Sequence, residues 1–145
     1  MTAYDLFETF TEVKPEWIDY NGHMNMGYYL VAFDEIATDG WFESIGIGPE
    51  HKNATNHSTF TLASNIDYLR EVVACDPLRI TTQLLDWDHK RLHYIHTMYH
   101  AGEGYVAATN ECLTMYIDMA TRRSTAFKDS LQSLFAEIQI GRAHV

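Results

Sequence analysis

The sequence predicts an α+β domain in which a curved antiparallel five-stranded sheet wraps around one long central helix, with a second helix at the carboxyl end. Two patterns lead to this fold class. Apolar residues recur at the period of a helix over residues 25–45, and strand-like segments joined by short turns follow over residues 58–117. Nothing in the pattern indicates a parallel crossover. We expect a single domain over residues 1–139, without internal repeat or linker.

The first predicted element is a strand over residues 6–13, because aromatic and β-branched residues alternate with glutamates there. Pro15 interrupts this strand. Asn21 and Gly22 then favour a tight turn, since both residues tolerate a positive φ. We therefore expect a loop with a tight turn between the first strand and the helix.

The second element is a long helix over residues 25–45. Its apolar residues recur at spacings of three and four, which is the period of one helix face: Met26, Tyr29, Leu30, Phe33, Ile36, Ala37 and Trp41. Further apolar side chains fall outside this stripe, so we expect the helix to be largely buried. Gly46, Gly48 and Pro49 end it, and the polar residues 51–57 are predicted to form a loop.

Four predicted strands complete the sheet, each rich in Thr, Ile, Tyr, Val and Leu: residues 58–68, 78–87, 91–99 and 105–117. The short polar separators between the last three favour antiparallel neighbours. Apolar residues on one face of residues 128–138 then predict a helix packed at the edge of the sheet. Residues 140–145 can be encoded by ATCGGAAGAGCACACGTC, a common sequencing-adapter sequence. This predicts a non-native tail, with an ordinary frayed end as the alternative.

Composition argues against several classes of protein. The formal charge of −10 lacks the basic footprint of nucleic-acid binding, although a local basic patch can still hold an anionic small molecule. The first residues lack the charged and apolar regions of a signal peptide, and no stretch is apolar enough to span a membrane. Cys75 and Cys112 stand apart, as expected of reduced thiols. We expect a cytoplasmic protein that binds neither nucleic acid nor membrane.

The segment with the clearest chemical content runs from Trp17 to Asn25 and includes Asp19, Gly22 and His23. A carboxylate on a loop just before a buried helix can act as a nucleophile or a general base. The amino terminus of the helix supplies unpaired N–H groups that can stabilise a developing negative charge. However, Asp before Asn-Gly is also an ordinary turn former, so the spacing alone leaves a purely structural role open.

This segment resembles the D-x-N-G-H-x-N motif of hotdog-fold thioesterases of the 4-hydroxybenzoyl-CoA type, and the order of elements resembles theirs along the whole chain. Four other stretches resemble a narrower branch, the betainyl-CoA thioesterases of carnitine degradation, which also occur fused to carnitine dehydrogenase. These stretches are residues 33–39, 67–71, 90–93 and 118–123.

The resemblance implies hydrolysis of a short acyl-CoA, foremost betainyl-CoA, to betaine and coenzyme A. Asp19 would act as nucleophile or general base, and the backbone N–H of Met26 would hold the oxyanion. His23 and Asn25 would brace the loop or cap the helix. No metal or separate cofactor is implied, since coenzyme A is part of the substrate. The alternatives are a general aryl- or acyl-CoA thioesterase and a non-catalytic acyl-CoA-binding module.

Substrate-binding candidates follow from the chemistry of the two halves of that substrate. A trimethylammonium group is best held over aromatic faces with a carboxylate nearby, which points to Trp17, Tyr28, Tyr29, Phe33, Asp34, Trp41 and Tyr68. Asp34 and Asp39 both lie inside the predicted buried helix, where Asp is unfavourable, so each needs a compensating partner. Most of these rings could equally fill the core. The phosphates of coenzyme A point to the basic residues Arg70, Lys90, Arg91, Arg122 and Arg123, whose alternative is a solvated surface role.

Two further expectations concern metals and assembly. His93 and His96 lie three apart on a predicted strand and so point to opposite faces, which argues against a zinc site. Hotdog domains assemble by pairing sheet edges, which hides strands that would otherwise invite aggregation. The resemblance therefore implies a homodimer or homotetramer.

Overall fold

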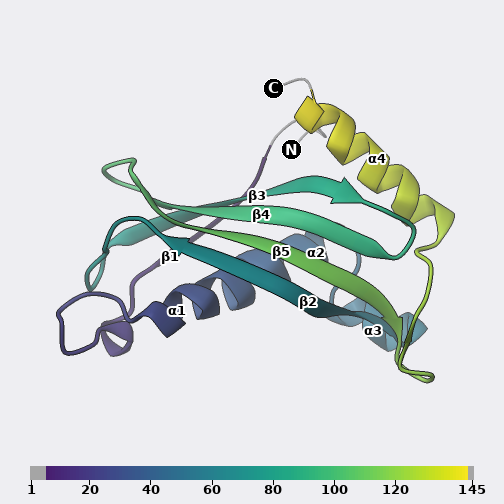
Figure 1. Cartoon of the computed structure of the whole chain (residues 1–145), viewed down its shortest axis with the longest axis horizontal. Coiled ribbons are helices and arrows are strands. Elements are labelled where there is room, and N and C mark those ends of the chain that lie inside the picture. Colours follow the sequence, from purple (N-terminus) through teal and green to yellow (C-terminus); the bar gives the residue numbers. More distant parts are fainter. Residues whose placement is uncertain (1–5, 144–145) are drawn as a thin grey trace.

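The computed structural model describes residues 6–143 (Figure 1). Strand β1 (Phe7–Glu12) leads through a 3-10 turn, η1 (Pro15–Trp17), to a continuous helical run. This run consists of α1 (Met26–Val31), a π-helical segment η2 (Ala32–Thr38) and α2 (Asp39–Ser44). The remaining elements are α3 (Pro49–Thr55), β2 (His57–Tyr68), β3 (Pro77–Trp87), β4 (Arg91–His100), β5 (Val106–Asp118), β6 (Arg123–Ser124) and α4 (Asp129–Ala143).

The five long strands form one antiparallel sheet in the order β1-β3-β4-β5-β2, and the two-residue β6 extends it beside β5. The chain enters at one edge with β1, and β2 forms the other edge after the helical run. Strand β1 pairs only with the first half of β3, from Pro77 to Thr82. This architecture confirms the predicted α+β class with its five-stranded antiparallel sheet and central helix.

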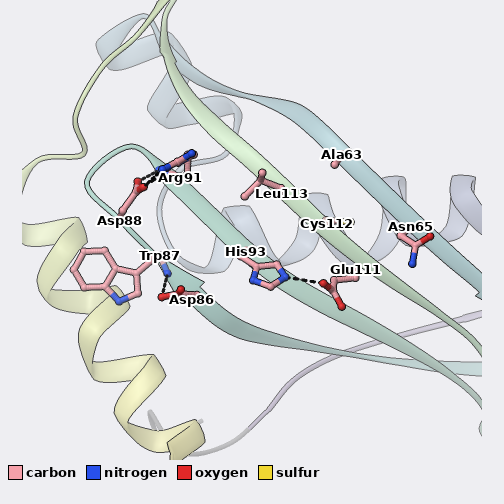
Figure 2. A pocket seen from close by; sticks show the side chains of 10 residues that line it. All are labelled: Ala63, Asn65, Asp86, Trp87, Asp88, Arg91, His93, Glu111, Cys112 and Leu113. Atoms are coloured by element: carbon pink, nitrogen blue, oxygen red, sulfur yellow. Dashed lines mark hydrogen bonds and ion pairs between the residues drawn. The ribbon is translucent and has the colours of Figure 1, made fainter.

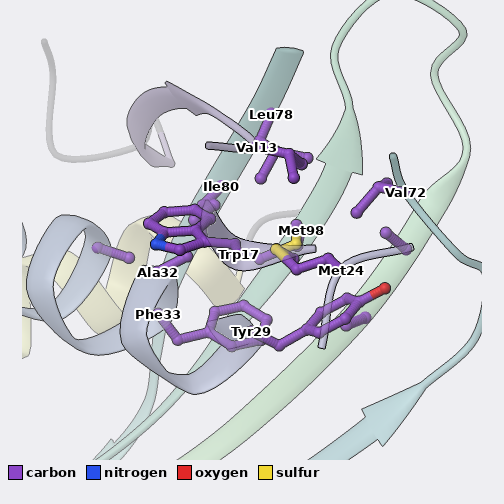
Figure 3. Close-up of a cluster of buried hydrophobic side chains, with 13 residues drawn as sticks. Val13, Trp17, Met24, Tyr29, Ala32, Phe33, Val72, Leu78, Ile80 and Met98 are labelled. Carbon is purple, nitrogen blue, oxygen red and sulfur yellow. The ribbon is translucent and has the colours of Figure 1, made fainter. Parts of the chain in front are cut away.

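The core lies between the helical run and one face of the sheet. Side chains alternate along β4, so that Leu92, Tyr94, His96 and Met98 are buried while their neighbours are only partly covered. Figure 3 shows how Trp17 and Met24, from the loop before the helix, join Tyr29 and Phe33 of the helix against the sheet. Each such side chain contributes roughly 1.5–3 kcal/mol when buried, so the loop is anchored to the core at both ends.

Burial of the helical run is one-sided, which corrects the expectation of a largely buried helix. Phe33 is completely buried, whereas Met26, Tyr28 and Leu30 are 65%, 37% and 44% exposed. The reason is that the sheet packs on one side of the helical run and does not enclose it (Figure 1). The opposite side therefore presents apolar groups to the surroundings of the single chain.

The prediction of a loop over residues 51–57 is wrong, because α3 (Pro49–Thr55) occupies most of this segment. Pro49 stands at the first turn, where its missing N–H costs nothing, and Asn56 ends the helix in the left-handed conformation with φ 57°. None of the residues of α3 is buried. A helix without an apolar face leaves no periodic signal in the sequence.

The predicted carboxyl-terminal helix is confirmed as α4. It packs beside the second half of β3, which β1 leaves unpaired, and Leu131 and Phe135 are buried there together with the partly covered Trp87. The Gln139 side chain also donates a hydrogen bond to the Leu85 carbonyl at 2.9 Å. The backbone of residues 140–143 continues α4, while residues 144–145 of the suspected tail lie outside the described part. No helix within residues 6–143 has the length and apolar character to cross a bilayer.

Candidate active site

The loop before α1 has a defined backbone geometry. Ile18 and Met24 form an isolated antiparallel bridge, and the Asp19 N–H donates to the His23 carbonyl at 3.1 Å. The Gly22 N–H donates to the Asp19 carbonyl at 3.0 Å, and Gly22 has φ +84°. This conformation favours glycine, as the sequence predicted for the turn. The loop is thus a small closed hairpin that holds Asp19 at its base.

The Asp19 carboxylate is fixed by two hydrogen bonds and is partly buried. Its Oδ1 accepts from the Asn21 N–H at 2.8 Å, and its Oδ2 accepts from the Asn25 side-chain amide at 3.3 Å. The Asn25 Oδ1 accepts in turn from the Gly27 N–H at 2.9 Å, which makes Asn25 the N-cap of α1. Asn25 therefore ties the carboxylate directly to the start of the helix.

The first N–H groups of the helical run lie next to this carboxylate. Tyr28 N–H donates to the Asn25 carbonyl at 3.0 Å, whereas the Met26 N–H has no hydrogen-bond partner within residues 6–143. Such free donors and the helix dipole together favour a negative charge at this end. Asn25 thus links a carboxylate to a helix terminus at which one backbone donor has no partner among the described residues.

A first cavity opens beside this terminus. The hydroxyl of Tyr68, at the end of β2, donates a hydrogen bond to the Met26 carbonyl at 3.1 Å. The rings of Tyr29 and Tyr68 meet edge to face, with their centroids 5.1 Å apart. The end of β2 thus returns to the start of the helix. The lining residues are His23, Met24, Met26, Tyr29, Tyr68, Leu69, Arg70 and Glu71.

A second cavity, of about 280 Å³, lies further along the helical run and the first half of β2. Asp34 and Asp39 both line it, together with Thr38, Phe42 and the basic Lys52. Partial burial first, and then the neighbouring carboxylates of Asp34 and Glu35, raise the pKa of Asp39. This cavity combines negative charge with an aromatic ring.

The other predicted aromatic residues lie elsewhere. Trp17 is buried, and its ring stacks on that of Tyr28 with the centroids 5.8 Å apart. Phe33 and Trp41 are buried in the hydrophobic core. These four residues line neither cavity. Of the predicted aromatic residues, the structure therefore brings Tyr29 and Tyr68 to the first cavity and none to the second, where the predicted carboxylates Asp34 and Asp39 lie.

The predicted basic residues divide between the two ends of the sheet. Arg70 borders the first cavity, with its guanidinium 3.8 Å from the centre of the Tyr105 ring. Lys90 ends the β3–β4 turn and Arg91 begins β4, while Arg122 and Arg123 follow β5, all at the far end. Lys90 donates to Ser124 at 3.3 Å, and Arg91 pairs with Asp88. Within one chain these four residues lie far from Asp19.

The strand histidines lie on opposite faces, as predicted. His93 contacts Glu111 at 2.9 Å on the outer face of the sheet (Figure 2). His96 points inward and is completely buried, with Nε2 2.8 Å from the Thr38 hydroxyl and Nδ1 2.7 Å from the Thr82 hydroxyl. Within the described residues, no three His, Cys, Asp or Glu side chains form a group suited to a metal ion.

Buried His96 predicts a pH-dependent stability. Burial lowers its pKa from 6.5 to about 4, so between these values the unfolded chain binds more protons than the folded chain. The free energy of unfolding should therefore decrease by up to about 3 kcal/mol as the pH falls from about 6.5 towards 4. Denaturant unfolding, followed by circular dichroism at pH 7, 6 and 5, measures this free energy of unfolding.

Burial also lowers the pKa of His51, which contributes in the same direction. The His51→Gln variant separates the two contributions, and the decrease should persist in it. A free energy of unfolding that is independent of pH in His51→Gln would show that His96 does not contribute.

Comparison with known proteins gives consistent results. Residues 13–135 match the family model described as the thioesterase-like superfamily. The chain is 38% identical to a betainyl-CoA thioesterase of Pseudomonas aeruginosa, over 88% of this chain and 77% of that protein. It is 30% identical to an L-carnitine dehydrogenase/betainyl-CoA thioesterase of a Rhizobium species, covering 93% of this chain but only 27% of the longer protein.

A solved structure shows the same fold. A Staphylococcus aureus protein in complex with CoA superposes with a TM-score of 0.89 at 31% identity, over 94% of this chain and 85% of that one. The predicted hotdog architecture is thereby confirmed.

Proposed function

The chain belongs to the thioesterase-like superfamily and is a thioester hydrolase, and we propose that it hydrolyses betainyl-CoA to betaine and coenzyme A. The observation that carries the proposal is the Asp19 carboxylate, held by Asn25 at the start of the helix, where the Met26 N–H has no partner among the described residues. Its similarity to the Pseudomonas aeruginosa betainyl-CoA thioesterase supports the acyl group.

This geometry supports the following reaction. Asp19 either attacks the thioester carbonyl carbon to form a mixed anhydride, or removes a proton from the water that attacks it. The carbonyl oxygen becomes negative and accepts a hydrogen bond from the Met26 N–H. The carbon–sulfur bond then breaks, and the coenzyme A thiolate leaves and takes up a proton. In the anhydride route, water finally releases the free acid and restores the carboxylate.

A second copy of the chain completes the site in this proposal. Asp34 is eight residues beyond Met26, or about 12 Å along the helix. The nitrogen of a betainyl group is only two bonds, roughly 2.5 Å, from the carbonyl carbon. A substrate held at Met26 would reach Asp34 of the same chain only if fully stretched along the helix, which favours an Asp34 from a second copy.

Strand β2 provides the surface for that second copy. It is a sheet edge whose side chains are mostly exposed, including Phe60 and Leu62, and it runs opposite to the helical run that precedes it. An unpaired edge of this kind favours a symmetric pair of copies. Antiparallel pairing of β2 with its copy brings the second cavity of one chain towards the first cavity of the other. It also brings Lys90, Arg91, Arg122 and Arg123 of one chain towards Asp19 of the other, where they would meet the phosphates of coenzyme A.

The test is a free-thiol release assay over a panel of CoA esters. The panel contains betainyl-CoA, its uncharged isostere 3,3-dimethylbutyryl-CoA, acetyl-CoA and 4-hydroxybenzoyl-CoA. We expect kcat/KM for betainyl-CoA to exceed that for the isostere at least about tenfold, which corresponds to 1.4 kcal/mol. Turnover of the aryl or plain esters alone would assign a general acyl-CoA thioesterase, and binding without turnover would assign a non-catalytic module.

A further inference from the structure

The π-helical segment η2 changes which side chains of the helix share a face. In an α-helix, residues five apart differ by about 140° around the axis, so Asp34 and Asp39 would point in different directions. In a π-helix the hydrogen bonds join residues five apart, which places them roughly above one another. The Asp39 N–H donates to the Asp34 carbonyl in this way, and both side chains line the second cavity. The π geometry is therefore what brings the two carboxylates together.

A buried chain of hydrogen bonds holds this geometry. The Thr38 hydroxyl lies 3.0 Å from the Phe33 carbonyl, five residues earlier, and can only donate to it. Thr38 must therefore accept from His96 Nε2–H at 2.8 Å, which leaves Nδ1 to accept from the Thr82 hydroxyl at 2.7 Å. The acceptor role of Nδ1 requires a neutral imidazole, which complete burial favours because it lowers the pKa of His96. The chain connects β3 and β4 to both ends of one π turn.

The surroundings of His96 leave little room for another arrangement. The Phe33 ring stacks on the imidazole, with the ring centroids 5.8 Å apart and an interplanar angle of 13°. The Tyr94 ring meets the imidazole edge on, with the centroids 5.2 Å apart. His96 is completely buried and Thr38 is 8% exposed. If the segment became α-helical, Thr38 would turn away from His96 and leave buried polar atoms without partners, which is unfavourable. The residues bonded at the two ends, Phe33 and Thr38, directly precede Asp34 and Asp39.

We propose that His96, acting through Thr38, fixes the π-helical segment and thereby places Asp34 and Asp39 on one wall of the acyl pocket. His96 is a positioning residue that determines the preference for a cationic acyl group, although it does not line the pocket. The identity of that acyl group rests on the proposed function. The position of the two carboxylates does not.

The test compares Thr38→Val with two matched variants. Thr38→Ser retains the hydroxyl. Thr114→Val is the same change at another buried threonine, whose hydroxyl has no partner among the described residues. We expect Thr38→Val to lower the ratio of kcat/KM for betainyl-CoA to that for 3,3-dimethylbutyryl-CoA by about tenfold, or 1.4 kcal/mol. The ratio should stay within about twofold of the wild type in Thr38→Ser and Thr114→Val.

A second readout does not depend on the substrate. Carbon-13 NMR titration should show the pKa of the Asp39 carboxyl returning towards its ordinary value in Thr38→Val, because Asp39 leaves its partly buried position and Asp34 moves away from it. The two matched variants should retain the raised value. If Thr38→Val does not fold, Thr38→Cys serves in its place, since a thiol is a weak donor.

A folded Thr38→Val or Thr38→Cys protein that retains both the substrate ratio and the raised pKa of Asp39 would overturn the proposal. If instead the wild type does not distinguish the two esters, the proposed substrate fails. The Asp39 titration then still decides whether His96 and Thr38 position the carboxylates.

Discussion

Replacement of Asp19 by Asn is expected to lower kcat for betainyl-CoA by about 10²–10⁴-fold, the range for loss of a general base, with a similar or larger loss for a nucleophile. The physical reason is that an amide can neither attack the carbonyl nor accept a proton from water. The bond from the Asn25 amide is lost, but the Asn oxygen can still accept the Asn21 N–H bond and the backbone bonds of the loop are unaffected, so the loop should keep its shape. Thiol release under saturating substrate measures kcat.

Two controls separate chemistry from folding in this experiment. The affinity for coenzyme A, measured by calorimetry, should be unchanged in Asp19→Asn, since the carboxylate does not bind the nucleotide. Asp86→Asn makes the same change at an exposed carboxylate of β3 and should retain wild-type kcat. Equal losses in both variants would argue against a specific role for Asp19.

Replacement of Asp34 by Asn is expected to lower kcat/KM for betainyl-CoA by about 10–100-fold, or 1.4–2.7 kcal/mol, because the substrate cation loses its charged partner. The value for 3,3-dimethylbutyryl-CoA should change by less than about twofold, since that ester has the same shape without the charge. Glu35→Gln is the matched control, because Glu35 is a neighbouring exposed carboxylate that is not among the residues lining the cavity. A loss of equal size for both esters would show that Asp34 does not act on the charge.

Mixing the two variants tests whether the site is shared between copies. A hybrid of one Asp19→Asn chain and one Asp34→Asn chain contains one intact site only if Asp19 and Asp34 come from different chains. Random reassociation at equal amounts should then restore about a quarter of the wild-type activity towards betainyl-CoA. If each site is built within one chain, every site in the hybrid carries a defect and no activity returns.

Much of the fold could be predicted because its periodic signals are strong. The strand-forming composition of β2 to β5 and the apolar stripe of the helical run both predicted the correct elements, and the positive φ of Gly22 agrees with the predicted turn. Asp19 and the start of the helix are close in sequence, so their proximity followed from local structure alone. Helix α3 was missed because none of its side chains is buried.

Features that depend on distant contacts could not be predicted. The apolar stripe continues through residues 32–38 at ordinary helical spacing, while the π turn depends on His96, 58 residues away from Thr38. The alternation of β4 placed His96 on the face opposite to His93 but could not name its partners. Apolar residues around the helix indicate that it is covered, but they do not show whether the same chain or a second copy covers it. One-sided burial within one chain was therefore unexpected. The separation of Arg70 from the other basic residues likewise required the strand order.

The most direct test of the central claim is the rate of free coenzyme A release from betainyl-CoA, measured side by side for the wild type and Asp19→Asn. The wild type should release thiol catalytically, and the variant should do so about 10²–10⁴-fold more slowly. Undiminished release by Asp19→Asn, or no release by the wild type, would contradict the assignment of this chain as an Asp19-dependent betainyl-CoA thioesterase.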